Sequence, residues 1–224
     1  HFTAEKYNVE PHKALEGLVE LINKKSEGED LFVLLTGDIT SKGNKKGFEQ
    51  ATRFFNSLFE KSKINSKNFI VCPGNHDCDL SDEAAEDRRA IVIEKIIKEP
   101  DGIKPSYIEQ CISVQSNYFE FIKKFDSYNY INKSISNHLL SRYEFKVGNK
   151  TISFNSFNVS WISRRKETQA QLFYPVNNID IDTLINANCN YNITLFHHPF
   201  HWLNHMNIRK FKDIVNKLSN LVFT

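Results

Sequence analysis

Residues 31–38 read Leu-Phe-Val-Leu-Leu-Thr-Gly-Asp, and residues 69–75 read Phe-Ile-Val-Cys-Pro-Gly-Asn. Each stretch is a short apolar run that stops at a glycine, which is typical of a buried strand. Between the two runs lies an amphipathic helix whose apolar stripe is Phe48, Ala51, Phe55, Leu58 and Phe59. A strand, a crossover helix and a second strand predict two parallel neighbours with a right-handed connection. The sequence therefore favours an α/β fold.

The chain continues this α/β pattern on both sides of the two runs. Residues 11–25 carry apolar side chains at helical spacing and predict a helix. Residues 79–140 are charged and helix-rich, and we interpret them as a helical insertion or cap. We expect this insertion to belong to one domain that spans residues 1–224, because single cores keep growing to roughly 250 residues.

The last part of the chain predicts further strands. Two alternating strands meet at Gly148-Asn149, which is a good hairpin turn. The parallel pattern then returns, with a loop over 197–205 before the last predicted helix. The predicted strands and helix are 142–147, 151–157, 192–196, 206–218 (the helix) and 220–224.

The composition is that of an ordinary globular protein. Hydrophobic residues make up 40% of the 224 residues and charged residues 25%, so disorder should not dominate. A formal net charge of +2 argues against a global electrostatic mode of binding DNA or membranes. A local basic cluster at Arg164, Arg165 and Lys166 could still meet an anionic substrate, although a solvated loop is the simpler interpretation.

The cysteines favour a reducing compartment, so we expect a cytoplasmic protein. None of the four belongs to a Cys-x-x-Cys pair, and Cys72 lies inside an apolar run. No apolar stretch approaches the roughly 20 residues that cross a bilayer, so no membrane segment is expected.

Polar side chains follow three of the predicted strands directly. Asp38 comes after the first, Asn75-His76-Asp77 after the second, and His197-His198 after the strand over 192–196. Because the carboxyl ends of parallel strands share one edge of a sheet, we expect these groups to converge there. A set of one carboxylate, one amide oxygen and imidazoles suits Mn, Fe or Zn.

Each of these strand ends also has a purely structural explanation. A Gly-Asp pair after a strand is usually a turn, and two histidines before a proline could form a structural loop. The sequence Gly-Asn-His-Asp over 74–77 is harder to explain by packing. The occurrence of all three in this order favours a functional site.

Three of these stretches resemble successive signatures of the calcineurin-like metallophosphoesterase family. They are Leu-Thr-Gly-Asp-Ile-Thr over 35–40, Pro-Gly-Asn-His-Asp over 73–77 and Phe-His-His-Pro over 196–199. Residues 154–161 also resemble the mid-domain strand of bacterial members. The resemblance implies a two-sheet sandwich flanked by helices, with the helical insertion inside it.

The two ends of the chain bear on the same resemblance. His1 corresponds to the histidine of the family's opening Asp-x-His motif, whose aspartate would precede it. The closing Gly-His-x-His motif would follow a strand that resembles residues 221–224. We therefore expect a segment cut at both ends from a longer protein that has further domains, with three expected ligands outside it.

The resemblance also implies roles for individual residues. Two divalent metal ions are expected, with Asp38 as the bridge, His1 on one ion, and Asn75 and His197 on the other. His76 is expected to be the catalytic residue that faces the substrate. Asp77 and His198 are expected to support the site from behind: Asp77 would hold its loop or orient an imidazole.

Ser41 is a departure from the family pattern. Many members have at this position an aspartate that pairs with the catalytic histidine. A hydroxyl does not raise the pKa of an imidazole as a carboxylate does, unless another group substitutes for it.

These observations favour a binuclear phosphoester hydrolase, a phosphodiesterase that acts on nucleotides or nucleic acid. A phosphomonoesterase with the same site stays open as an alternative. So does a catalytically silent metal-binding interaction domain of a larger protein, and so does a purely structural α/β domain.

Overall fold

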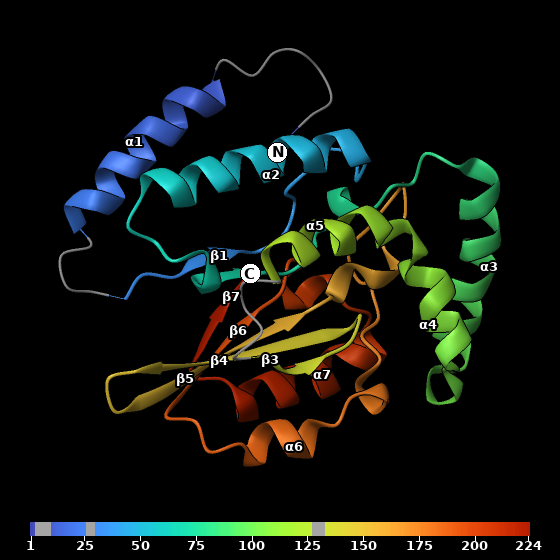
Figure 1. Ribbon diagram of the computed structural model, residues 1–224. Coiled ribbons are helices and arrows are strands. Elements are labelled where there is room, and N and C mark those ends of the chain that lie inside the picture. The colour runs from blue at the N-terminus through green and yellow to red at the C-terminus, as the bar shows by residue number, and fades with distance from the viewer. Residues whose placement is uncertain (3–9, 26–29, 127–132) are drawn as a thin grey trace.

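Two β-sheets lie face to face at the centre of the molecule, with helices on their outer sides (Figure 1). The computed structural model describes residues 1–2, 10–25, 30–126 and 133–224. The architecture is the expected α/β sandwich. No helix in these ranges is both long and apolar enough to span a bilayer.

The smaller sheet pairs β1 (Val33–Leu35) with β2 (Phe69–Val71) in parallel, with Val33 opposite Phe69. Helix α2 (Lys45–Lys61) connects the two strands, so the predicted parallel pair is confirmed. The apolar stripe of α2 is largely buried, and α1 (Glu10–Lys25) lies outside α2 (Figure 1).

The larger sheet has five strands in the order β3-β4-β5-β6-β7. The first three are antiparallel and the last three parallel. The predicted hairpin is confirmed, because β4 and β5 meet at Gly148-Asn149, where Gly148 has a φ of +59°. The strands are β3 (Lys133–Ser136), β4 (Leu140–Val147), β5 (Lys150–Phe157), β6 (Tyr191–Leu195) and β7 (Leu221–Phe223).

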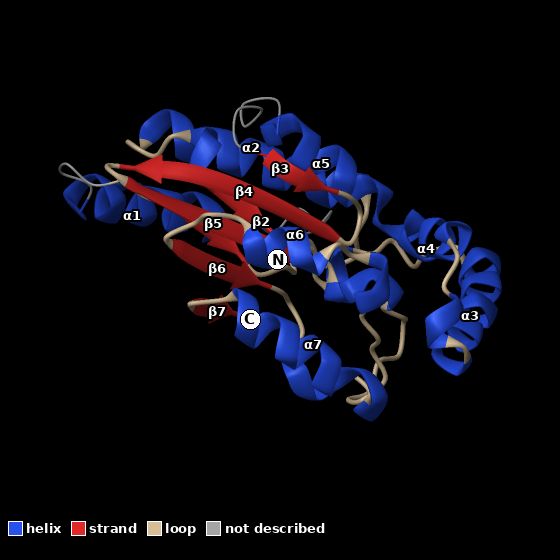
Figure 2. Ribbon diagram, turned by 90° about the horizontal axis from the view of Figure 1, so that it is seen from below, coloured by secondary structure: helices blue, strands red, loops and turns tan. Residues whose placement is uncertain are grey.

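Two helices cover the outer face of the larger sheet, as Figure 2 shows from below. They are α6 (Ile181–Asn186), which the sequence did not predict, and α7 (His205–Leu218), which it did. Phe211 of α7 is fully buried beside Phe157 of β5 and Phe196, with ring centroids 5.5 and 5.4 Å apart. This packing fixes the end of β6, from which the histidine pair emerges.

The contact between the two sheets is mainly apolar. The ring of Phe32, just before β1, lies 4.8 Å from that of Phe154 on β5. Ile70 and Leu195 are fully buried in the same cluster. The hydroxyl of Ser156 on β5 donates to the carbonyl of Val71 on β2 over 2.6 Å. This hydrogen bond joins the sheets close to the ends of their strands.

The described part of residues 79–140 contains the α-helices α3, α4 and α5 and the strand β3. Helices α3 (Glu83–Lys98) and α4 (Pro105–Ile112) project at one end of the sandwich (Figure 1). Helix α5 (Ser116–Asp126) instead packs into the core around β2, where Phe121 lies near Phe48. The end of this predicted helical range thus joins the larger sheet, because β3 pairs with β4.

Candidate metal centre

Three loops meet at one end of the sandwich, and they come from both sheets. Asp38 and Asn75 follow β1 and β2 of the smaller sheet, whereas His197 follows β6 of the larger one. The expectation that all three strand ends lie on one edge of a single sheet is therefore wrong. The groups converge because the two sheets face each other with the ends of these strands together.

The carboxylate of Asp38 lies at the centre of this meeting point. Its Oδ1 accepts the backbone N–H of His76 over 3.1 Å and lies 3.3 Å from Nε2 of His197. Its Oδ2 lies 3.5 Å from Nε2 of His1. Each carboxylate oxygen thus faces a different imidazole, which is the arrangement expected of a bridging ligand.

His1 reaches the site because the chain beside it pairs with the loop after β1. Phe2 forms a parallel bridge with Thr40, and the N–H of Phe2 donates to the carbonyl of Ile39 over 2.8 Å. The His1 ring lies 5.2 Å from the ring of His76.

Two glycines allow the three loops to approach so closely. A Cβ added to Gly37, where φ is +94°, would lie 2.7 Å from Nδ1 of His197 and 2.7 Å from the nitrogen of Gly74. A Cβ added to Gly74 would lie 2.2 Å from Oδ1 of Asp38. No other residue type leaves this space empty.

The imidazole of His197 is held with one nitrogen toward the site. Its Nδ1 lies 2.6 Å from the carbonyl oxygen of Thr36, so Nδ1 carries the hydrogen and donates it. Burial lowers the pKa of His197, although the charge of Asp38 opposes this, and the neutral ring is favoured. The lone pair of Nε2 then faces Oδ1 of Asn75 at 3.1 Å and Oδ1 of Asp38 at 3.3 Å.

Nε2 of His197 therefore faces two oxygen atoms with no hydrogen between them, which favours a cation at this point. Metal bonds of about 2.1 Å place adjacent ligand atoms roughly 3.0–3.4 Å apart, which matches the two distances at His197. The carbonyl of Thr36 supplies the outer hydrogen bond that ligating histidines usually make. The donor set fits a divalent ion with nitrogen and oxygen ligands.

The amide of Asn75 is an essential member of this set. Within the described ranges, no group of three or more His, Cys, Asp or Glu side chains qualifies as a metal site by itself. The ligand roles of His1, Asp38, Asn75 and His197 remain predictions.

His76 is exposed and contacts the backbone of Ser41. Its Nδ1 lies 3.1 Å from the carbonyl oxygen of Ser41, so Nδ1 carries a hydrogen and Nε2 is the free nitrogen. A backbone carbonyl, and not the Ser41 hydroxyl, thus occupies the place of the carboxylate that the family pattern leads one to expect. It fixes the tautomer of the ring without adding a charge.

Asp77 is fully buried and holds the loops after β1 and β2 together. Its carboxylate accepts the backbone N–H groups of Ile39, Thr40 and Gly74 over 3.2, 2.9 and 2.9 Å. Burial raises the pKa of Asp77 to about 6, although these hydrogen bonds lower it. Of the two roles expected for Asp77, its hydrogen bonds match that of holding the loop.

His198 is buried behind His197, and the ring centroids lie 4.7 Å apart. The Ser160 hydroxyl lies 3.2 Å from its Nδ1, and Oε2 of Glu167 lies 3.3 Å from its Nε2. Burial acts to raise the pKa of Glu167, but the contact with His198 and other donors lower it below the ordinary value. Sequence reasoning missed Ser160 and Glu167, since neither belongs to a pattern of its own.

A cleft of about 420 Å³ opens beside Asn75 and His76. Its walls include Lys42, Arg164 and Arg165, so two members of the basic cluster do reach the site. Arg165 donates to the carbonyls of Leu80 and Ser81 and to the carboxylate of Glu83, and so holds the rim.

The sequence profile of calcineurin-like phosphoesterases matches residues 9–220, nearly the whole chain. The chain belongs to this family. Calcineurin-like phosphoesterases are generally metal-dependent and usually bind two divalent metals, which agrees with the donor set at Asp38. The match confirms the resemblance drawn from the three signatures and the sandwich fold that it implied. A comparison with curated proteins found no match.

Proposed function

We propose that this calcineurin-like phosphoesterase is a binuclear, cytoplasmic phosphodiesterase that acts on nucleotides or nucleic acid. The observation that supports the proposal best is that Oδ1 of Asn75 and Oδ1 of Asp38 lie 3.1 and 3.3 Å from Nε2 of His197, beside a cleft with cationic walls. Asp38, Asn75, His197 and His1 would hold two ions of Mn, Fe or Zn.

The ions and His76 divide the chemistry between them. When bound, two divalent ions supply positive charge to the phosphoryl oxygens and make a water molecule more acidic. His76 lines the cleft with Nδ1 committed to Ser41, so its Nε2 is available to the substrate. Imidazole has a pKa near neutrality, which suits it to protonate a leaving oxygen or to stabilise the transferring phosphoryl group.

The cleft also carries charge that suits an anionic substrate. Lys42 is exposed on one wall, and Arg164 and Arg165 are on another. Arg165 is occupied with the rim, which leaves Lys42 and Arg164 to meet the substrate. A catalytically silent interaction domain would not need His76 held in one tautomer beside such a cleft. A phosphomonoesterase would use the same groups, so these residues do not separate it from a phosphodiesterase.

The test is hydrolysis by the Mn-loaded protein of bis(4-nitrophenyl) phosphate, 4-nitrophenyl phosphate, cyclic nucleotides and DNA. We expect the diesters to be preferred. Asp38→Asn should reduce turnover at least a hundredfold and lower metal occupancy, because a bridging carboxylate serves both ions. His76→Ala should retain its metal and slow the chemical step by roughly a hundredfold.

The leaving group then separates the two roles of His76. A nitrophenolate leaves without a proton, whereas an alkoxide needs one, so a larger loss on alkyl esters indicates proton donation. Near-normal turnover in Asp38→Asn with both metals bound would contradict the proposed site.

A further inference from the structure

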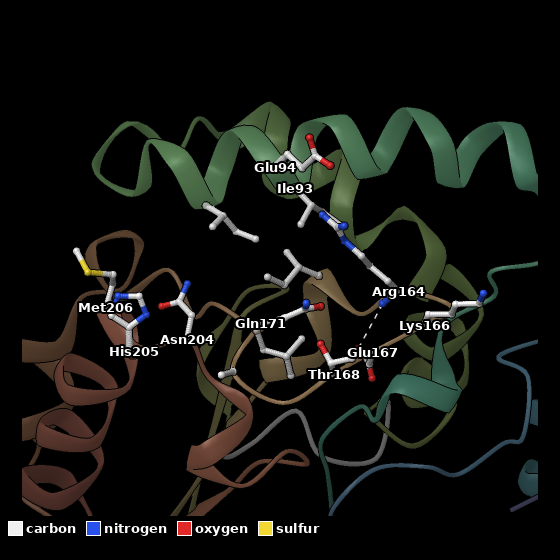
Figure 3. A pocket seen from close by; sticks show the side chains of 14 residues that line it. Ile93, Glu94, Arg164, Lys166, Glu167, Thr168, Gln171, Asn204, His205 and Met206 are labelled. Atoms are coloured by element: carbon white, nitrogen blue, oxygen red, sulfur yellow. Dashed lines mark hydrogen bonds between the residues drawn. The ribbon is translucent and has the colours of Figure 1, made fainter.

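A second cavity, of about 520 Å³, lies between α3 and the segment that leads into α7 (Figure 3). Its apolar walls are Ile93 and Ile97 of α3, Ile162 and Leu172 beyond β5, and Met206 of α7. Cavities of roughly 300–1,000 Å³ with mostly apolar walls are the usual sites for small organic ligands. The proposed metal ligands and His76 do not line this cavity.

Polar side chains are present on both sides of the cavity, and Glu94 lies on the α3 side. Figure 3 shows the amide side chains of Gln171 and Asn204 opposite Ile93 and Glu94 of α3. Oδ1 of Asn204 already accepts the N–H of Asn207 over 2.9 Å, so Gln171 is the amide that can both donate and accept hydrogen bonds, as the edge of a heteroaromatic ring does. Apolar walls above such groups suit a flat ring better than an alkyl chain or a sugar.

Arg164 connects this cavity to the reaction cleft, because it lines both. Its backbone N–H donates to Oε1 of Glu167 over 3.3 Å, and its Nη2 makes a long contact of 3.5 Å with the carbonyl of Ala90 on α3. Among the described residues the guanidinium makes this one long hydrogen bond, which leaves its other donors for a ligand. Glu167 in turn lies against His198, so the cavity wall and the candidate metal centre share a boundary.

We propose that this cavity binds the aromatic arm of a phosphodiester whose phosphoryl group lies at the metal centre. A nucleobase or a ring of similar size is the occupant, and Arg164, which lines both the cavity and the cleft, binds the phosphoryl oxygens. This inference rests on the proposed function for the position of the phosphoryl group. It adds the site that distinguishes a diester with an aromatic arm from small phosphates.

The first measurement is of binding, because binding does not depend on turnover. The probes are methyl(1-naphthylmethyl)phosphinate and dimethylphosphinate, which carry the single negative charge of a diester but cannot be hydrolysed. Calorimetry on the Mn-loaded protein should show the naphthyl probe binding at least tenfold more tightly than the dimethyl probe. Equal affinity for the two probes would overturn the proposal.

Variants that fill the cavity test whether the naphthyl group of the probe binds there. Ile97→Trp and Met206→Trp enter it from opposite walls, and both positions are exposed enough, at 38% and 69%, to accept a larger side chain. Each should remove the preference for the naphthyl probe and leave dimethylphosphinate unchanged. Ile91→Trp is the matched control, since Ile91 is on the same helix, is 70% exposed and does not line the cavity. An unchanged naphthyl preference in both filled variants, with melting temperatures as in the wild type, would overturn the proposal.

Hydrolysis is measured separately on the same variants. If the wild type binds the naphthyl probe in the cavity but hydrolyses no ester, the proposed function fails and the cavity assignment stands. If the wild type hydrolyses diesters with no preference for an aromatic arm, the cavity assignment fails and the proposed function stands.

Discussion

Asp38 has a φ of +56°, a backbone conformation that residues other than glycine rarely adopt. Strain of this kind costs of order 1–3 kcal/mol and persists only where the surroundings enforce it. Here the enforcement comes from Gly37 and Gly74, which pack the loops around the carboxylate with no space for a Cβ. The strained backbone of Asp38 and the two glycines together hold the carboxylate so that Oδ1 faces His197 and Oδ2 faces His1.

The first residue-scale prediction is that Gly74→Ala abolishes metal binding and activity without unfolding the protein. Alanine can adopt the φ of −99° that Gly74 has, but its Cβ would lie 2.2 Å from Oδ1 and 2.4 Å from the backbone nitrogen of Asp38, so the Asp38 loop must move. Metal content and diester hydrolysis measure the effect. Gly102→Ala is the control, because a Cβ there meets nothing within 4 Å. Normal metal content in Gly74→Ala would show that the position of Asp38 does not matter.

The second residue-scale prediction concerns Asp77. Asp77→Asn places an NH₂ group among backbone N–H donors, so buried donors lose their acceptor, at about 1–3 kcal/mol for each unsatisfied group. We expect the free energy of unfolding in urea to fall by about 2–4 kcal/mol. Asp180→Asn is the control, because Asp180 is an exposed N-cap of α6 and asparagine caps equally well. Equal stability of the two variants would mean that Asp77 does not hold the loops.

At the scale of elements, one buried side chain fastens α3 to the rest of the molecule. Arg89 is 3% exposed, and its Nε donates to the carbonyl of Cys111 in α4 over 2.8 Å. Its Nη2 donates to the carbonyl of Trp161 beyond β5 over 3.3 Å, and its Nη1 binds Glu86 over 2.9 Å. Helix α3 forms a wall of the second cavity, the one of about 520 Å³ proposed to bind an aromatic arm. Because Arg89 holds α3 in place, it also sets the width of that cavity.

The element-scale prediction is that Arg89→Ala lowers the free energy of unfolding by about 3 kcal/mol, because a broken buried pair leaves Glu86 and two carbonyls without their donor. Arg88→Ala is the matched control, since Arg88 is the exposed neighbour on the same helix. Urea unfolding measures both, and similar small losses would contradict the anchoring role. Binding of the naphthyl probe should weaken in Arg89→Ala alone.

Sequence patterns predicted the elements with strong local signals and missed those that depend on distant contacts. The pairing of β1 with β2 and the hairpin at Gly148-Asn149 follow from crossover length and turn chemistry, which are local. The short strand β3 and helix α6 have weak periodicity and depend on the elements that they contact, β4 for β3 and α7 for α6. Nothing in residues 192–196 indicates that β6 belongs to a different sheet from β1 and β2.

The candidate site shows the same division. The signatures at Asp38, Asn75-His76 and His197 were visible because polar groups follow apolar runs. The carbonyls of Thr36 and Ser41 that orient the two imidazoles could not be predicted from the sequence, because every residue has a carbonyl. Glu167 was hidden for a different reason: its partner His198 is 31 positions away, and only folding brings them together.

At the scale of the whole molecule, the site is a junction between the two sheets. Asp38 and Asn75 extend from the smaller sheet and His197 from the larger one. Near this junction two hydrogen bonds join the sheets, one from Ser156 to Val71 and one from His197 to Thr36. Without a cation, the lone pairs at the junction face one another and oppose its closure. Metal binding should therefore stabilise the fold as well as supply the chemistry.

The last prediction follows from this arrangement: metal removal lowers the stability of the entire sandwich. A ligand at one hundred times its dissociation constant stabilises the native state by about 2.7 kcal/mol. For a chain of this size, 1 kcal/mol corresponds to about 2–4 °C in melting temperature, so Mn should raise the melting temperature by about 5–10 °C. EDTA should reverse the increase. Gly102→Ala should respond as the wild type does, whereas Gly74→Ala and Asp38→Asn should melt at the same temperature with and without Mn. If Mn leaves the wild-type melting temperature unchanged at saturating concentrations, the two sheets are not joined through a metal at Asp38.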